Sequence, residues 1–174
     1  MHVVFIGASG SGKTHWGREL ARLTGRPFAD LDALVEATLA CSIPELFASG
    51  REAEFRDVES ALLAEVLSAE VPGVLSTGGG TPMRPESFGR LQDSGAHIVA
   101  LMPPLEKLVQ RLETVWAHRP LLSAEGPNGW RSKVEDLFHE RASTYAELAN
   151  ETWTGKEEEA CLDLAKRLNS SQSR

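Results

Sequence analysis

Apolar positions along this chain follow two patterns that alternate: short continuous runs, and residues spaced three to four positions apart. Short apolar runs at residues 3–6, 27–29, 73–76, 98–101 and 152–153 predict buried strands. Between them, apolar residues recur every three to four positions. This spacing predicts helices over residues 14–24, 31–39, 52–67, 105–112, 134–148 and 157–168. Strands that alternate with helices are typical of a parallel sheet covered on both faces, so the pattern predicts an α/β fold.

The ends of several elements carry their own signals. Gly25 is expected to stop the first helix, and Ser42, with Pro44 in the first turn and Glu45 three residues on, predicts the start of a further helix. Residues 114–129 contain prolines and glycines with little apolar periodicity, which predicts an irregular segment. We expect one domain over residues 1–168, followed by a disordered tail at 169–174.

Composition narrows the class of protein. The chain has 174 residues, which suits one domain, and its formal net charge of −7 argues against a general binder of nucleic acid or anionic membranes. Cys41 and Cys161 fit no metal-ligand spacing. The sequence has no apolar run long enough to span a membrane, and its start lacks the basic region of a signal peptide. A monomeric cytoplasmic enzyme is the expectation.

Residues 7–14 read GASGSGKT and match the phosphate-binding P-loop, G-x-x-x-x-G-K-[ST], directly after a strand and before a helix. The backbone N–H groups of Gly10, Ser11 and Gly12 would surround phosphate oxygens at the positive end of the helix. Lys13 would reach the β- and γ-phosphates, and the Thr14 hydroxyl would bind Mg²⁺. The motif predicts ATP binding, and the lack of a guanine-reading N-K-x-D pattern favours a small-molecule kinase.

Three further features suggest the phosphate acceptor. Asp30 and Asp32 follow the second strand, at the sheet edge where ligands bind in open α/β folds; the alternative is that Asp32 caps a helix. Arg56 and Glu59 stand one helical turn apart; the alternative is an exposed ion pair. The triple glycine of STGGG would let backbone approach a ligand; the alternative is a plain turn.

These segments together resemble shikimate kinase. GASGSGKT, DLD, FRDVE, STGGG, HRPLL and HERASTY occur in the order and at the spacings of that family, from about Val3 to Trp153. The resemblance implies a P-loop NTPase of three α/β/α layers, with a five-stranded parallel sheet and a mobile lid at about residues 114–129. It also implies transfer of the ATP γ-phosphate to the 3-hydroxyl of shikimate, with Mg²⁺ as cofactor.

The resemblance also implies roles for particular residues. Asp30 would bind Mg²⁺ through water, and Asp32 would hold the substrate hydroxyls and act as base. Arg56 and Arg141 would grip the shikimate carboxylate. Gly78, Gly79 and Gly80 would line the substrate pocket. Arg119 would be a lid arginine that reaches the phosphates, and Arg111 would contact the adenine.

The sequence departs from the family pattern at three places without losing a proposed functional group. His15 follows Thr14 where a second hydroxyl residue is usual, Pro82 replaces an aliphatic residue, and residues 141–145 read RASTY. Trp116, within the predicted lid, is expected to be exposed and to make a contact on closure. The alternative functions are gluconate kinase or another small-molecule P-loop kinase, and a nucleotide sensor without catalysis.

Overall fold

A computed structural model describes residues 1–172 and shows five parallel strands in one sheet, in the order β2-β3-β1-β4-β5. The central strand, β1 (Val3–Gly7), pairs with β3 (Val74–Ser76) on one side and β4 (His97–Leu101) on the other. The outer strands are β2 (Phe28–Asp30) and β5 (Glu151–Trp153). All five predicted strands are confirmed. Because the strands are parallel, their carboxyl ends meet at one edge, where the candidate site lies.

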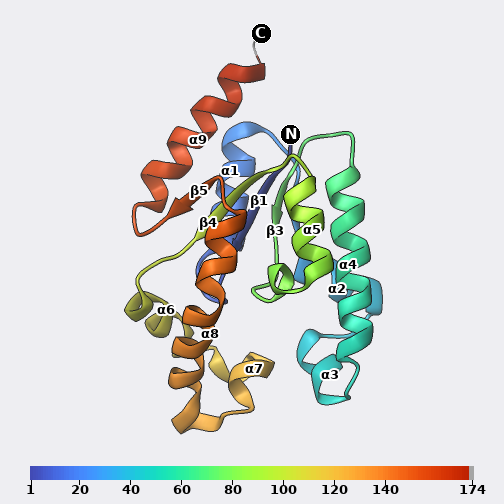
Figure 1. Cartoon of the computed structure of the whole chain (residues 1–174), viewed down its shortest axis with the longest axis vertical. Coiled ribbons are helices and arrows are strands. Elements are labelled where there is room, and N and C mark those ends of the chain that lie inside the picture. Colours follow the sequence, from blue (N-terminus) through green and yellow to red (C-terminus); the bar gives the residue numbers. More distant parts are fainter. Residues whose placement is uncertain (173–174) are drawn as a thin grey trace.

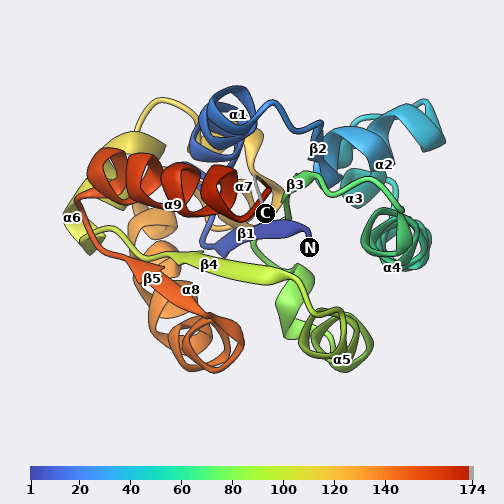
Figure 2. The same ribbon diagram turned by 90° about the horizontal axis from the view of Figure 1, so that it is seen from above.

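Helices cover both faces of the sheet (Figure 2). α1 (Lys13–Thr24) and α9 (Glu157–Gln172) lie on one face, and α5 (Pro85–Asp93) and α8 (Gly126–Leu148) lie on the other. Three helices follow β2: α2 (Leu31–Leu39), α3 (Ile43–Ala48) and α4 (Glu52–Ser68). In Figure 1, α3, α6 (Leu105–Leu112) and α7 (Pro120–Ser123) gather at the end toward which β1 runs. Within residues 1–172, no helix combines the length and the apolar character needed to cross a lipid bilayer.

The alternating side chains of β1 divide the core between the two faces. Val3 and Phe5 are fully buried in a cluster with residues of α1 and α9. Val4 and Ile6 are fully buried in a second cluster, which includes residues of α2, α4, α5 and α8. Burial on both faces explains why this strand is continuously apolar rather than alternating. The same burial holds the loop after β1 at a fixed place over the sheet.

The predicted helix ends agree with the structure. Gly25 follows α1 with φ of 66° in the left-handed region, where glycine is least strained. Ser42 caps α3 in a reciprocal pair: its hydroxyl accepts a hydrogen bond from the Glu45 backbone N–H, and the Glu45 carboxylate accepts one from the Ser42 backbone.

The structure corrects the sequence prediction in three segments. α5 was not predicted, and α8 begins at Gly126 rather than near Val134. Residues 114–129 are not irregular, because they contain the 3₁₀ turn η2 (Trp116–His118), α7 and the start of α8. α9 continues through residues 169–172, which were assigned to a disordered tail. Residues 173 and 174 lie outside the described part of the chain.

Trp116 is also placed differently from the prediction. Its side chain is half-buried rather than exposed, and its ring stacks on that of Trp130 at the start of α8, with centroids 5.9 Å apart and planes within 1°. It packs against the apolar cluster formed by α6, α7 and α8. The segment before α7 is therefore anchored on α8.

Candidate active site

The P-loop connects β1 to α1 in the predicted position. Gly10 and Gly12 have φ of 79° and 103°, a backbone conformation that is strained for any residue with a side chain. Gly12 is the N-cap residue of α1, so the positive end of the helix dipole faces the loop. Arg111, from the last turn of α6, donates hydrogen bonds to the carbonyls of Ser11 (2.9 Å) and Gly10 (3.4 Å). The guanidinium of Arg111 therefore fixes the outer side of the P-loop.

Lys13 is buried beneath this loop. Its ammonium group donates to the carbonyls of Gly7 and Ala8, both at 2.9 Å. The pKa of Lys13 is lowered to about 8, mainly by burial and also by the charges of Arg119 and Arg141, while Asp32 and Asp30 act in the opposite direction. The site therefore concentrates positive charge and carboxylates within a small volume.

Thr14 and Asp30 link the end of the P-loop to the end of β2. The Thr14 hydroxyl donates to Asp30 Oδ2 at 2.7 Å and lies 3.5 Å from the Ser76 hydroxyl at the end of β3. Asp30 Oδ1 also accepts from the backbone N–H of Ala33, so Asp30 caps α2. The alternative that Asp32 is the cap is wrong, because Asp32 lies in the first turn of that helix.

Asp32 has the properties of a poised base. Its pKa is raised from 3.8 to about 6, with burial as the largest cause and the charges of Asp30 and Glu59 acting in the same direction. Lys13 and Arg119 oppose this shift. A carboxylate with such a pKa is ionised near neutral pH and is still basic enough to accept a proton.

The triple glycine after β3 is closely surrounded, mostly by the protein itself. A Cβ on Gly78 would lie 2.7 Å from Asp32 Oδ1, and one on Gly79 would lie 3.1 Å from the backbone nitrogen of Ser9 in the P-loop. A Cβ on Gly80 would lie 3.4 Å from the Arg56 guanidinium. None of the three has a left-handed φ. Close approach, rather than a turn conformation, explains the absence of a side chain at Gly78 and Gly79, whereas the 3.4 Å contact at Gly80 is an ordinary van der Waals distance.

Arg56 and Glu59 do not form the exposed ion pair that was the alternative interpretation. The Glu59 side chain is 1% exposed and the Arg56 side chain 14% exposed, and the Arg56 Nη1 to Glu59 Oε2 distance is 3.0 Å. Glu59 Oε1 accepts a second hydrogen bond, of 2.6 Å, from the hydroxyl of Thr81. The guanidinium lies over the rings of Phe55 and Phe47, at 4.8 and 5.8 Å from their centroids.

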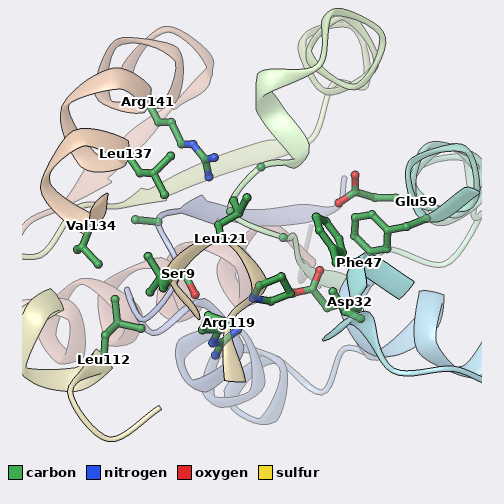
Figure 3. A pocket seen from close by; sticks show the side chains of 18 of the residues that line it. Ser9, Asp32, Phe47, Glu59, Leu112, Arg119, Leu121, Val134, Leu137 and Arg141 are labelled. Atoms are coloured by element: carbon green, nitrogen blue, oxygen red, sulfur yellow. The ribbon is translucent and has the colours of Figure 1, made fainter. Parts of the chain in front are cut away.

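Arg141 reaches the pocket from α8, on the side opposite Asp32 (Figure 3). Its Nε is buried and makes no hydrogen bond within residues 1–172. One turn along α8, the Tyr145 hydroxyl donates to the carbonyl of Gly79 at 2.6 Å, and burial raises the pKa of this phenol to about 12. The guanidinium of Arg141, which lines the pocket, is suited to an anionic ligand.

One pocket brings all of the predicted acceptor residues together. Asp32, Phe47 and Glu59 lie on one side and Arg141, Leu137 and Val134 on the other, with Leu121 of α7 between them (Figure 3). Arg119, an exposed residue immediately before α7, lies at the same pocket. The predicted residues in its wall are Asp32, Arg56, Gly78, Gly79, Gly80, Arg119 and Arg141.

Sequence reasoning missed several neighbours of this pocket. It left the burial of Glu59 open and gave no role to Thr81 or Tyr145, which hold the triple-glycine segment. The only signal for Tyr145 was its place in the RASTY segment, and Thr81 carried none. The predicted nucleotide residues Lys13, Thr14 and Arg111 lie beside the pocket wall rather than in it, on the side of α1 and α6.

A phosphate-binding loop beside a pocket with a basic carboxylate and several arginines defines a P-loop phosphotransferase that acts on a small acidic molecule. Comparison with known proteins identifies the group within this class. The family model described as shikimate kinase matches residues 9–170. The chain belongs to the shikimate kinase family, which uses ATP as co-substrate.

Individual relatives agree with this assignment. A shikimate kinase from Synechococcus sp. (strain CC9902) is 39% identical over 83% of this chain and 73% of its own, and one from Burkholderia pseudomallei (strain 1710b) is 36% identical over 86% and 78%. The solved structure of a shikimate kinase from Acinetobacter baumannii in complex with shikimate has a TM-score of 0.85, with 30% identity over 99% of this chain and 95% of that one. A gluconokinase from Sinorhizobium meliloti, 20% identical with a TM-score of 0.63, shares the fold alone.

Proposed function

We propose that this protein transfers the γ-phosphoryl group of ATP to the 3-hydroxyl of shikimate, giving shikimate 3-phosphate and ADP. The observation that carries the proposal is the placement of Asp32, Arg56 and Arg141 around one pocket beside the P-loop. A carboxylate base faces the pocket together with two cations suited to an acceptor's carboxylate. The membership of the chain in the shikimate kinase family supports the choice of acceptor.

The nucleotide would occupy the loop between β1 and α1. Backbone N–H groups of Gly10, Ser11 and Gly12 would bind its phosphates, and Lys13 would exchange its loop carbonyls for the β- and γ-phosphate oxygens. Arg111 is held against the loop from α6, beside the half-buried Trp16 near Gly12. We propose that Arg111 contacts the adenine base from this position.

The end of the P-loop offers oxygen atoms suited to Mg²⁺. The Thr14 hydroxyl and the Asp30 carboxylate are in hydrogen-bond contact and are the hard ligands that this ion prefers. In the part of the chain that the structure describes, no three His, Cys, Asp or Glu side chains gather as a metal site. Thr14 directly and Asp30 through water would therefore hold Mg²⁺ together with the phosphates, where the ion would neutralise phosphate charge.

The acceptor would lie between Asp32 and the two arginines. Arg56 and Arg141 would bind its carboxylate through charge-assisted hydrogen bonds, while the segment of Gly78, Gly79 and Gly80 forms the wall of the pocket. Asp32 would take the proton of the 3-hydroxyl as that oxygen bonds to the γ-phosphorus. The bond from this phosphorus to the β–γ bridging oxygen would break, and the negative charge of that oxygen would remain on the leaving ADP.

Arg119 is the proposed lid arginine. Its charge influences the pKa of both Lys13 and Asp32, which supports a role beside the proposed phosphate site and the proposed base. We propose that the segment at about residues 114–129 moves over the bound substrates, so that Arg119 stabilises charge on the transferred phosphoryl group and water is kept away. A nucleotide sensor without catalysis would be expected to lack Asp32 or Arg119, and both lie at the pocket.

Two further proposals concern the state of the protein. All the residues assigned to the reaction come from one chain, which supports activity as a monomer. The cysteines Cys41 and Cys161 are both free, which suits a reducing compartment such as the cytoplasm, where ATP is available.

The position of the transferred phosphate tests the proposal. The purified protein is incubated with ATP, Mg²⁺ and shikimate, and the product is analysed by ³¹P–¹H correlation spectroscopy. The proposal predicts a phosphorus coupled to the proton on C3 and formation of ADP in equal amount. Phosphate on another hydroxyl, or ADP without phosphorylated shikimate, would contradict it.

A further inference from the structure

Thr81, the residue after the triple glycine, is completely buried beside the acceptor pocket. Its side chain is 0% exposed, and its hydroxyl donates a 2.6 Å hydrogen bond to Glu59 Oε1. Its backbone N–H donates to the carbonyl of Gly78 at 3.2 Å, which closes a turn over the glycines. The hydroxyl is therefore held at a fixed place with its hydrogen bond directed at one carboxylate oxygen.

Glu59 divides its two oxygens between two donors. Oε2 accepts from Arg56 Nη1 at 3.0 Å, and Oε1 accepts from Thr81. Because this carboxylate is 1% exposed, solvent cannot replace either donor. Loss of the Thr81 hydroxyl would leave Oε1 unsatisfied in the interior, and the carboxylate would be expected to rotate or draw its other partner toward the vacant side.

Arg56 is the group that such a movement would reach. Its guanidinium carbon lies over the rings of Phe55 and Phe47, and its Nη2 makes a weak hydrogen bond of 3.4 Å to Glu52 Oε1. Contacts with aromatic rings are less directional than hydrogen bonds, so the bond to Glu59 is the contact that fixes where Nη1 points. Both terminal nitrogens lie 3.4 Å from the point that a Cβ on Gly80 would occupy, so the guanidinium lies beside the pocket wall.

We propose that Thr81 is a positioning residue for acceptor binding: through Glu59 it fixes the direction in which Arg56 presents its guanidinium to the acceptor carboxylate. This inference rests on the proposed role of Arg56 in binding that carboxylate. Thr81 does not touch the reacting atoms, and its loss changes acceptor affinity rather than phosphoryl transfer. The nucleotide site, on the other side of the triple glycine, is unaffected.

The test compares two buried threonines at the two ends of the glycine segment. Thr81→Val removes the hydroxyl at nearly constant shape, and Thr81→Ser restores a hydroxyl. Thr77→Val is the matched control, because the Thr77 hydroxyl is also buried but donates to the carbonyl of Phe5 at 3.2 Å. We expect Thr81→Val to raise the KM for shikimate by about tenfold or more, with kcat and the KM for ATP within about threefold of the parent. Thr81→Ser should return the KM close to the parent value.

Thr77→Val should lower the melting temperature as Thr81→Val does, without the rise in KM. Equal effects of both valine variants on KM would mean that the hydroxyl only stabilises the segment, and the proposal would be overturned. A parental KM in Thr81→Val, or a loss confined to kcat, would overturn it too. If Thr81→Val does not fold, Thr81→Ala, which adds no second methyl group at the site, is compared with Thr81→Ser by the same criteria.

A double-mutant cycle separates this inference from the function on which it rests. In an Arg56→Lys background, the guanidinium that Thr81 positions is gone, so adding Thr81→Val should change the KM for shikimate by less than about twofold. An undiminished effect would show that Thr81 does not act through Arg56. If Arg56→Lys alone leaves the KM unchanged, the proposed role of Arg56 fails, and the inference about Thr81 fails with it.

Discussion

Asp32 Oδ1 lies 2.7 Å from the point that a Cβ on Gly78 would occupy. At the same point converge Thr81 Oγ1 at 3.0 Å and Glu59 Oε1 at 3.1 Å. A side chain at position 78 would therefore displace the proposed base or the carboxylate that holds Arg56. The absence of a side chain at Gly78 thus leaves the space in which Asp32, Thr81 and Glu59 meet.

The first prediction follows from this contact. Gly78→Ala should lower kcat by about tenfold or more, because the added methyl group pushes Asp32 away from the acceptor hydroxyl and a displacement of about 1 Å is costly in catalysis. Steady-state kinetics with both substrates saturating provide the measurement.

Gly89→Ala is the matched control for that variant. Gly89 lies within α5, and a Cβ there would meet no atom within 4 Å. The control should keep parental activity and gain up to about 1 kcal/mol of stability from the better helix propensity of alanine. Parental kcat in Gly78→Ala would show that Asp32 tolerates displacement.

The second prediction concerns Asp32 itself. Asp32→Asn should lower kcat by roughly 10²-fold or more, as removal of a general base does, with little change in ATP affinity. In the parent, kcat/KM for shikimate should fall as the pH drops through about 6, because this ratio reports the free enzyme, in which Asp32 becomes protonated there. Pre-steady-state or steady-state pH profiles test both statements, and a variant with near-parental turnover would remove Asp32 from the mechanism.

The third prediction is that the same substitution stabilises the fold. The pKa of Asp32 is raised from 3.8 to about 6, so the unfolded chain loses this proton first as the pH rises. Folding stability is therefore lost between about pH 4 and pH 6, and the loss stays constant above pH 6. Asp32→Asn should be more stable than the parent by about 2 kcal/mol at pH 7.5, with the gain shrinking toward pH 4. Urea unfolding at both values measures it; a variant less stable at pH 7.5 would contradict the raised pKa.

The fourth prediction tests recognition of the acceptor carboxylate. Arg56→Lys and Arg141→Lys should each raise the KM for shikimate by about 30-fold, because lysine lacks the planar donor pair. Arg90→Lys, at an exposed ion pair with Glu86 on α5, is the control and should leave the KM unchanged. Shikimate methyl ester should be a poor substrate of the parent. An ester phosphorylated as well as the acid would rule out the arginine pair as a carboxylate site.

The fifth prediction concerns the proposed lid. Arg119→Ala should lower kcat by roughly 10²-fold with the KM for shikimate nearly unchanged, and Arg119→Lys should recover part of the loss. The stacked pair of Trp116 and Trp130 is an internal reporter. In a variant with Trp16 and Trp153 replaced by phenylalanine, its fluorescence should change when ATP binds. Parental kcat together with an unresponsive signal would leave no evidence for a catalytic lid.

Much of the fold could be predicted because its signals are local. The strand of residues 3–6 is apolar on both faces, and the P-loop motif follows it at once. α5 escaped prediction because its nine residues offer only Phe88 and Leu91 as large apolar positions and contain Gly89. The start of α8 resembled a loop because of its glycines and Pro127, although proline is well tolerated in a first helical turn.

The candidate site was predictable in its chemistry but not in its contacts. Spacing placed Arg56 and Glu59 on one helical turn, but whether that pair faced solvent depended on residues 78–81, which lie beside it and are distant in sequence. The bond between Thr81 and Glu59, and that between Tyr145 and Gly79, likewise join residues 22 and 66 positions apart. Such contacts follow from tertiary packing, which no local pattern encodes.

The most direct test of the central claim is the rate of ADP release with different acceptors. The parent protein is assayed with ATP and Mg²⁺ in the presence of shikimate, of gluconate, and of no acceptor, with Asp32→Asn as the inactive control. The account predicts rapid release with shikimate, and release with gluconate no faster than the background without acceptor. Release that is as fast with gluconate as with shikimate, or that does not depend on an acceptor, would contradict it.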